Sequence, residues 1–100
     1  MLEKIMALKN SDGLTLKKYQ SIIYKSGWQV ADTGVECKTA VEAVAAIERY
    51  NGTCGVWYEN GVYYIDHSFR VSTKKQAMEI GRKCNQISVL KWSTMTLVYC

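Results

Sequence analysis

The sequence predicts a protein of the α+β class, in which two helices cover one face of an antiparallel sheet. Two segments with helical periodicity begin at a threonine and end at an asparagine, and runs rich in β-branched and aromatic residues flank each of them. Between the two segments lies Asn60-Gly61, the pair that two-residue β-hairpins favour. Because 100 residues are close to the usual size of one domain, we expect a single domain over residues 1–100.

The first helix is predicted for the segment TAVEAVAAIERYNG, residues 39–52. Thr39 has the character of an N-cap, and Glu42 follows three residues later, as in a capping box. Asn51-Gly52 should end the helix, because glycine adopts the left-handed conformation at low steric cost. The apolar positions recur with helical spacing: Ala40, Ala43, Val44 and Ile47.

The second helix is predicted for TKKQAMEIGRKCN, residues 73–85, with Thr73 as N-cap and Gln76 three residues later. Gly81 costs about 1 kcal/mol within a helix. On the buried side it would let the helix approach the sheet closely. Asn85 ends the segment, and one face carries Ala77, Ile80, Gly81 and Cys84.

The two halves of the chain match at one constant offset. Each predicted helix follows an extended run and precedes a strand, so β-α-β occurs twice, over residues 35–59 and 62–92. With a hairpin between them, this is the split β-α-β, or ferredoxin-like, arrangement. Segment 95–99 adds a C-terminal strand. The matching pairs are Thr39 and Thr73, Glu42 and Gln76, Ala43 and Ala77, Val44 and Met78, and Asn51 and Asn85.

Residues 1–34 form an N-terminal extension in this prediction. Segment 19–32, YQSIIYKSGWQVAD, is rich in β-formers and predicts a hairpin that turns at Ser26-Gly27. The alternative is a short helix that starts at Thr15. Residues 1–10 have the pattern of a short amphipathic helix.

Charge and hydropathy limit the compartment and the partners. The formal net charge of +4 permits contact with nucleic acid or with an acidic protein and establishes neither. No apolar run has the length of a membrane span. Glu3, Lys4 and Lys9 interrupt the N-terminal segment, which therefore lacks the apolar core of a signal peptide. We expect a cytoplasmic protein with no membrane partner.

Cysteine and histidine provide little catalytic or metal-binding chemistry. None of the four cysteines forms a C-x-x-C pair, and His67 is the only histidine, so we expect no metal site; a zinc site built by all four cysteines is the alternative. His67 lies between Asp66 and Ser68, but the members of a triad converge from separate segments. The phosphate-binding and nucleophile-elbow motifs are absent. We therefore expect no catalytic residues, no cofactor and no enzymatic activity; an enzyme that uses His67 is the alternative. We expect buried roles for Cys37, Cys54 and Cys84.

The predicted hairpin separates two faces. Asn60-Gly61 as the turn pairs Trp57 with Tyr64, which places Val56, Tyr58, Tyr63 and Ile65 on a face that should pack under the helices. The other face has exposed aromatics that would anchor a partner, unless the terminal strands cover them. Its acids disfavour nucleic acid on this face. Its members are Trp57, Glu59, Val62, Tyr64 and Asp66.

A second candidate surface lies at the start of the second helix. Lys74 and Lys75 oppose the helix dipole there, so local stability does not explain them. With the backbone N–H groups they would suit a phosphate or a carboxylate cluster, and Arg70, Arg82 and Lys83 would extend the patch. Direct nucleic-acid binding through this helix end is the alternative function; a solvated helix end without a function is the simpler interpretation.

Residues 54–92 contain W-x-x-N-G-x-Y-Y-I-D and K-K-x-A-x-x-I-G-x-x-x-N-Q-I-S. In these motifs, and in a second block at residues 24–32, the chain resembles small accessory proteins of bacteriophages and other mobile elements. The resemblance implies an inhibitor of host defence, of which anti-CRISPR proteins are examples, that occupies a surface of a protein or ribonucleoprotein effector. We expect the partner-binding residues to be Trp57, Glu59, Tyr64, Asp66, Arg70, Lys74 and Lys75. The strand over residues 95–99 would also allow two copies to form a homodimer by edge pairing.

Overall fold

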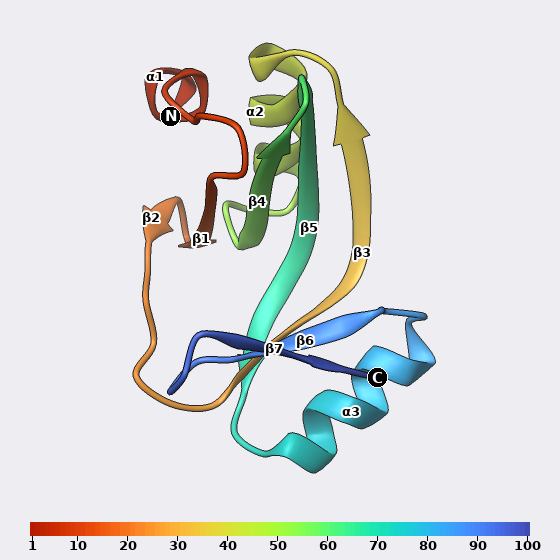
Figure 1. Ribbon diagram of the computed structural model, residues 1–100. Coiled ribbons are helices and arrows are strands. Elements are labelled where there is room, and N and C mark those ends of the chain that lie inside the picture. Colours follow the sequence, from red (N-terminus) through yellow and green to blue (C-terminus); the bar gives the residue numbers. More distant parts are fainter. The chain divides into compact units, whose positions relative to one another are not determined.

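The computed structural model describes residues 1–100 and contains three helices and seven strands (Figure 1). The α+β class is therefore confirmed. Short N-terminal strands and one C-terminal strand accompany the predicted elements, as expected from the sequence. The elements are α1 (Leu2–Met6), β1 (Gly13–Lys17), β2 (Gln20–Ser21), β3 (Trp28–Cys37), α2 (Ala40–Arg49), β4 (Cys54–Glu59), β5 (Val62–Val71), α3 (Lys74–Lys83), β6 (Ser88–Lys91) and β7 (Thr96–Tyr99).

The strands pair in the order β2-β1-β4-β5-β3-β6-β7. The chain divides into two compact units. Unit 1 contains Met1–Ile22 and Gly34–His67, and unit 2 contains Ile23–Thr33 and Ser68–Cys100. The boundary falls inside β3 and β5, so these two strands have residues in both units. The single-domain organisation stays a prediction.

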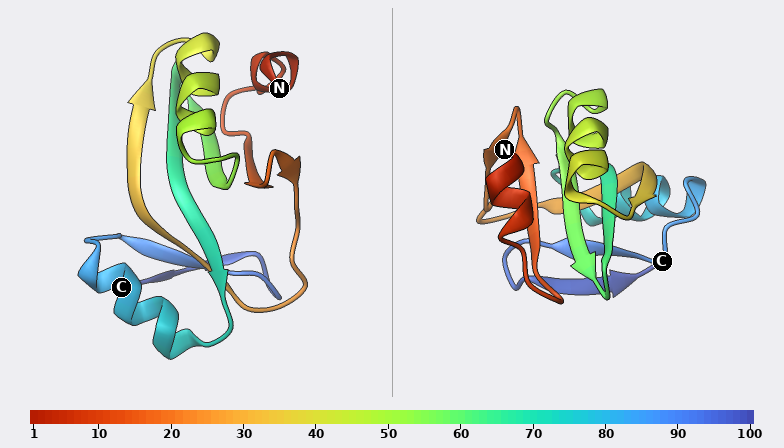
Figure 2. Two further views of the ribbon diagram at one scale, coloured as in Figure 1. Left: turned by 180° about the vertical axis from the view of Figure 1, so that it is seen from behind. Right: turned by 90° about the horizontal axis from the view of Figure 1, so that it is seen from above.

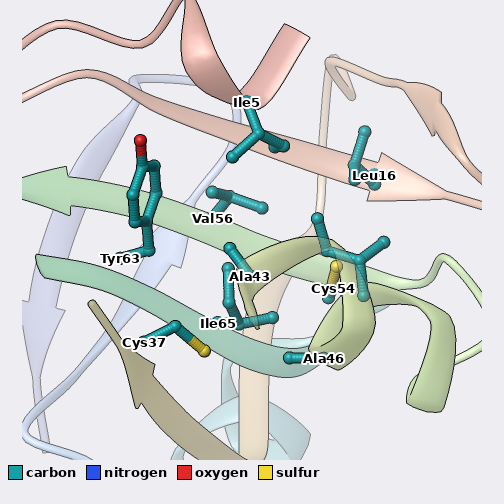
Figure 3. Close-up of a cluster of buried hydrophobic side chains, with 10 residues drawn as sticks. Ile5, Leu16, Cys37, Ala43, Ala46, Cys54, Val56, Tyr63 and Ile65 are labelled. Atoms are coloured by element: carbon teal, nitrogen blue, oxygen red, sulfur yellow. The ribbon is translucent and has the colours of Figure 1, made fainter. Parts of the chain in front are cut away.

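In unit 1, α2 packs on β4 and β5 and buries an apolar core (Figure 2). The side chain of Thr39 accepts a hydrogen bond from the backbone N–H of Glu42, and Asn51 and Gly52 after the helix have φ values of 54° and 70°. Both predicted ends of this helix are thus confirmed. The stick view shows how α1, β1, α2 and the hairpin contribute to this core (Figure 3). The buried members are Ile5, Leu16, Cys37, Ala43, Ala46, Ile47, Cys54, Val56, Tyr63 and Ile65.

In unit 2, α3 packs against β6. Both hydrogen bonds of the predicted capping box between Thr73 and Gln76 are present. A Cβ atom added at Gly81 would lie 2.6 Å from Cys100 Sγ and 3.2 Å from Val89 Cγ1. The close approach predicted for this glycine is therefore confirmed. The buried apolar residues of this core are Trp28, Val30, Ala77 and Val89.

The β4–β5 hairpin has the predicted register. Asn60 and Gly61 have φ values of 48° and 82°, as a type I′ turn requires. Trp57 lies opposite Tyr64, and Val56 lies opposite Ile65. The two faces of the hairpin therefore carry the side chains that the sequence assigned to them.

The N-terminal hairpin was predicted at the wrong place. β1 and β2 turn at Lys18 and Tyr19, not at Ser26-Gly27, and no helix begins at Thr15. The two turn residues have φ values of 49° and 68°, a conformation that their side chains do not favour. A contact distant in sequence holds the turn, because the backbone N–H of Tyr19 donates to the carbonyl of Gly52 at 3.0 Å.

The start of β3 and the structure of residues 22–27 also differ from the prediction. β3 already begins at Trp28, which pairs with Lys91 of β6, so the predicted extension over residues 1–34 includes more than half of this strand. Residues 22–27 form no strand, although they contain β-formers. The predicted N-terminal helix is confirmed as the short helix α1.

Candidate binding surface

The surface that we call the aromatic face lies on the hairpin of unit 1, opposite the side that packs on α2. Trp57 is 45% exposed, whereas Tyr64, directly opposite it on β5, is partly buried. Their strand neighbours Val56, Tyr63 and Ile65 are buried in the core. The predicted division of the hairpin into a packed face and a face with accessible aromatics is therefore present.

A glycine makes room for the indole ring of Trp57. Gly13 of β1 lies opposite Trp57 on the side away from β5. A Cβ atom added at Gly13 would lie 2.8 Å from Cε3 and 3.3 Å from Cζ3 of the indole. Any larger residue at position 13 would therefore move the ring, so Gly13 helps to set the position of Trp57.

Asp66 lies on the same face as Tyr64, two residues further along β5. A Cβ atom added at Gly34 of β3 would clash with the Asp66 carboxylate, so the absence of a side chain there accommodates it. Burial raises the pKa of Asp66 above its ordinary value of 3.8. The carboxylate is therefore partly desolvated, and a cation brought beside it would stabilise its charged form.

Two further carboxylates belong to the aromatic face. Glu59 follows Trp57 by two residues, and its Oε2 accepts a hydrogen bond of 2.8 Å from the hydroxyl of Ser11. Glu36 of β3 is exposed and shares a face with Gly34, because Val35 and Cys37 on either side of it pack toward the core.

Sequence reasoning did not select Glu36, Gly13 or Gly34 as site residues. The alternation of β3, with an apolar residue on each side of Glu36, was the signal that could have revealed the first of them. We therefore define the aromatic face by Trp57, Tyr64, Glu36, Glu59 and Asp66.

The predicted basic residues lie in unit 2 and have different surroundings. Arg70 Nε donates to the carbonyl of Ser26 at 2.8 Å, and Arg70 Nη2 donates to Ser26 Oγ at 3.2 Å. The guanidinium also lies 5.5 Å from the ring centroid of Tyr24. Arg70 therefore holds the irregular segment 22–27. Lys74 and Lys75 are exposed in the first turn of α3.

The segment Asp66-His67-Ser68 contains the only histidine and contacts several elements. Ser68 is buried, and its Oγ accepts a hydrogen bond of 3.1 Å from Gln29 Nε2. The ring of His67 lies 5.6 Å from that of Tyr50, centroid to centroid, and the Asp66 carboxylate lies over Gly34.

The cysteines differ in burial. Cys37 and Cys54 lie in the core of unit 1 as predicted, whereas Cys84 is partly buried and Cys100 is exposed. Burial and, to a smaller extent, Asp66 raise the pKa of Cys54 to about 11. No three or more histidine, cysteine, aspartate and glutamate side chains form a group that could hold a metal ion.

Comparison with known proteins gave no match to a family model, to a curated protein or to a solved structure. None of the three helices has the length and apolar character needed to cross a membrane.

Proposed function

We propose that this protein is a non-enzymatic binding protein that occupies a surface of a protein partner through its aromatic face. The observation that carries the proposal is the position of Trp57, a residue that is 45% exposed while the residues beside it in the strand face the core. Large aromatic side chains on an open face are typical anchors of protein interfaces.

The energetics of burial favour this assignment. An aromatic side chain buries 150–250 Å² when fully covered, so a partner that covers the exposed part of Trp57 removes roughly 100 Å² of apolar surface from water. At about 25 cal/mol per Å², this stabilises a complex by roughly 2 to 3 kcal/mol before the costs of association. That magnitude is in the range of an interface hot spot.

The biological setting of the proposal comes from the resemblance of residues 54–92 to phage accessory proteins. In that setting the partner is a cytoplasmic protein or ribonucleoprotein effector of a bacterial defence system such as CRISPR-Cas. The 100-residue chain would inhibit this effector by occupying its surface. The proposal also includes the ferredoxin-like arrangement. The pairing order β4-β5-β3-β6 of its four strands supports that arrangement.

Direct nucleic-acid binding is the second candidate. Lys74 and Lys75 are both exposed beside the capped N-terminus of α3, where they are accessible to phosphate groups. This function predicts an affinity that falls steeply with salt, because phosphate contacts release counterions. An affinity for single- or double-stranded oligonucleotides that does not change with salt would contradict it.

Pairing of two copies through β7 also remains a prediction. β7 is an edge strand, and Leu97 on it is 59% exposed. Sedimentation of wild-type protein and Leu97→Lys at several concentrations tests the prediction. A concentration-dependent dimer in the wild type alone would support it.

The proposed function is tested by affinity capture from bacterial lysate, with and without nuclease. Wild-type protein is compared with Trp57→Ala and with Tyr99→Ala, the latter as a control with an exposed aromatic in unit 2. We expect a defined protein that resists nuclease, binds the wild type and the control, and is lost with Trp57→Ala. Equal capture by all three proteins would contradict the assignment of the aromatic face.

A further inference from the structure

Resting on the proposed function, we propose that the aromatic face recognises an arginine side chain of the partner protein. The guanidinium would stack on the ring of Trp57 or Tyr64 and pair with a carboxylate beside it. The inference therefore identifies the chemistry of the partner's central contact.

The local charge of the aromatic face differs from that of the whole chain. The chain has a net charge of +4, yet the aromatic face carries three carboxylates, Glu36, Glu59 and Asp66. A lysine shares this side of the sheet at Lys17 of β1. It lies four residues from Gly13, the neighbour of Trp57, which corresponds to roughly 13 Å along a strand. The surroundings of the rings are thus acidic on a protein that is basic as a whole.

The spacing within the hairpin places a carboxylate near each aromatic ring. Directly opposite side chains such as Trp57 and Tyr64 have Cβ atoms about 5 Å apart, and diagonal neighbours lie about 7–8 Å apart. Asp66 is the diagonal neighbour of Trp57, and Glu59 is the diagonal neighbour of Tyr64. Cation–π contacts extend to about 6 Å from a ring centroid. One guanidinium over the rings can therefore also reach a carboxylate.

The Asp66 carboxylate lies in surroundings that would favour a cation beside it. It is partly buried over Gly34, and burial disfavours its charge. A cation that binds beside Asp66 would stabilise the charged form of the carboxylate. Because the carboxylate is already partly desolvated, the two charges would interact more strongly than in water.

Among biological cations, the guanidinium of arginine suits this site best. It is planar, stacks on aromatic faces and donates in pairs to carboxylates, whereas the lysine ammonium is a strongly hydrated point charge. Nucleic-acid phosphates would meet three carboxylates on the same face. The chemistry therefore favours a protein partner with an exposed arginine over a nucleic acid.

The test uses the full chain and three small probes, of which two are cations with different head groups and one is neutral. N-acetyl-arginine methylamide, the corresponding lysine compound and the neutral citrulline compound are titrated into ¹⁵N-labelled protein, and two-dimensional NMR spectra are recorded. We expect the arginine probe to shift the indole N–H of Trp57 and the amide signals of Gly13, Tyr64 and Asp66. The citrulline probe should bind on the order of tenfold more weakly, because it keeps the shape and loses the charge.

Variants make the site assignment falsifiable. Asp66→Asn should weaken arginine binding severalfold while its NMR spectrum stays that of a folded protein, and Trp57→Ala should weaken this binding at least as much. Tyr99→Ala in unit 2 should leave it unchanged. Equal affinity for arginine and citrulline, stronger binding of lysine, or an unchanged affinity in Asp66→Asn would overturn the inference.

The outcome also separates this inference from the proposed function. If arginine fails to bind while Trp57→Ala still abolishes capture of the partner, the aromatic face is the binding surface and the arginine chemistry is wrong. If the arginine probe binds at Trp57 while Trp57→Ala still captures the partner normally, the partner uses a different surface. Both the proposed function of the aromatic face and the inference about the partner's arginine are then wrong.

Discussion

The hairpin has one packed face and one open face, so alanine substitutions at two neighbouring residues of β5 should lower the free energy of unfolding by very different amounts. Ile65 is fully buried, whereas Tyr64 beside it points to the aromatic face and is partly buried. In Ile65→Ala, the lost transfer free energy of the removed CH₂ and CH₃ groups is roughly 2.4 kcal/mol. The cavity under α2 adds to this, so we expect a loss of about 3 to 4 kcal/mol in the free energy of unfolding.

Tyr64→Ala should lose only about 1 kcal/mol, because water can enter the space that the ring leaves. The assay is urea denaturation followed by far-ultraviolet circular dichroism, in which a difference of about 2 kcal/mol separates the two midpoints by roughly 1 to 2 M. Ile65→Val serves as a conservative control with an expected loss of about 1 kcal/mol. A cost for Tyr64→Ala equal to that for Ile65→Ala would refute the open face.

Three further predictions concern the turn, the thiols and the buried carboxylate. Gly61→Ala should lower the free energy of unfolding by about 1 kcal/mol, because φ at this position is +82°. An added Cβ atom meets no neighbour within 4 Å, so the backbone conformation alone causes this loss. Urea denaturation measures the loss, and an unchanged midpoint would contradict the left-handed conformation of the turn. Cys100, which is exposed, should react with a thiol reagent at pH 8 long before Cys54, which is buried and whose pKa is raised to about 11. Mass spectrometry of partly labelled protein gives the order in which the cysteines are modified. Early modification of Cys54 would contradict its burial in the core of unit 1. Burial raises the folded-state pKa of Asp66, so the folded protein binds this proton more tightly and stability falls as pH rises from 3.8 through the raised pKa. Asp66→Asn should lack this decrease and be more stable than the wild type at pH 7, as urea denaturation across pH 3.5 to 7 would show; a less stable variant would contradict the burial of the charge.

Local chemistry explains most of what the sequence predicted correctly. The threonine caps of α2 and α3 and the Asn60-Gly61 turn use side-chain oxygens and left-handed backbone conformations that act within a few residues. Once that turn is placed, alternation along the strands assigns Trp57 and Tyr64 to one face and Ile65 to the other.

Contacts distant in sequence explain what could not be predicted. The turn at Lys18 and Tyr19 contains two unfavourable φ values, and the Tyr19 backbone is held by the carbonyl of Gly52. Arg70 resembled part of a basic patch, yet its guanidinium donates to Ser26. The contribution of Gly13 depends on the pairing of β1 with β4, which no local pattern indicates.

The most direct test of the central claim is the affinity of the purified partner for wild-type protein, Trp57→Ala and Tyr99→Ala, measured by isothermal titration calorimetry at one salt concentration. Circular dichroism first confirms that each variant is folded. A loss of about 2 kcal/mol raises Kd roughly thirtyfold, and we predict at least this increase for Trp57→Ala, with no change for Tyr99→Ala. A Kd for Trp57→Ala equal to that of the wild type would contradict the claim that the aromatic face binds the partner.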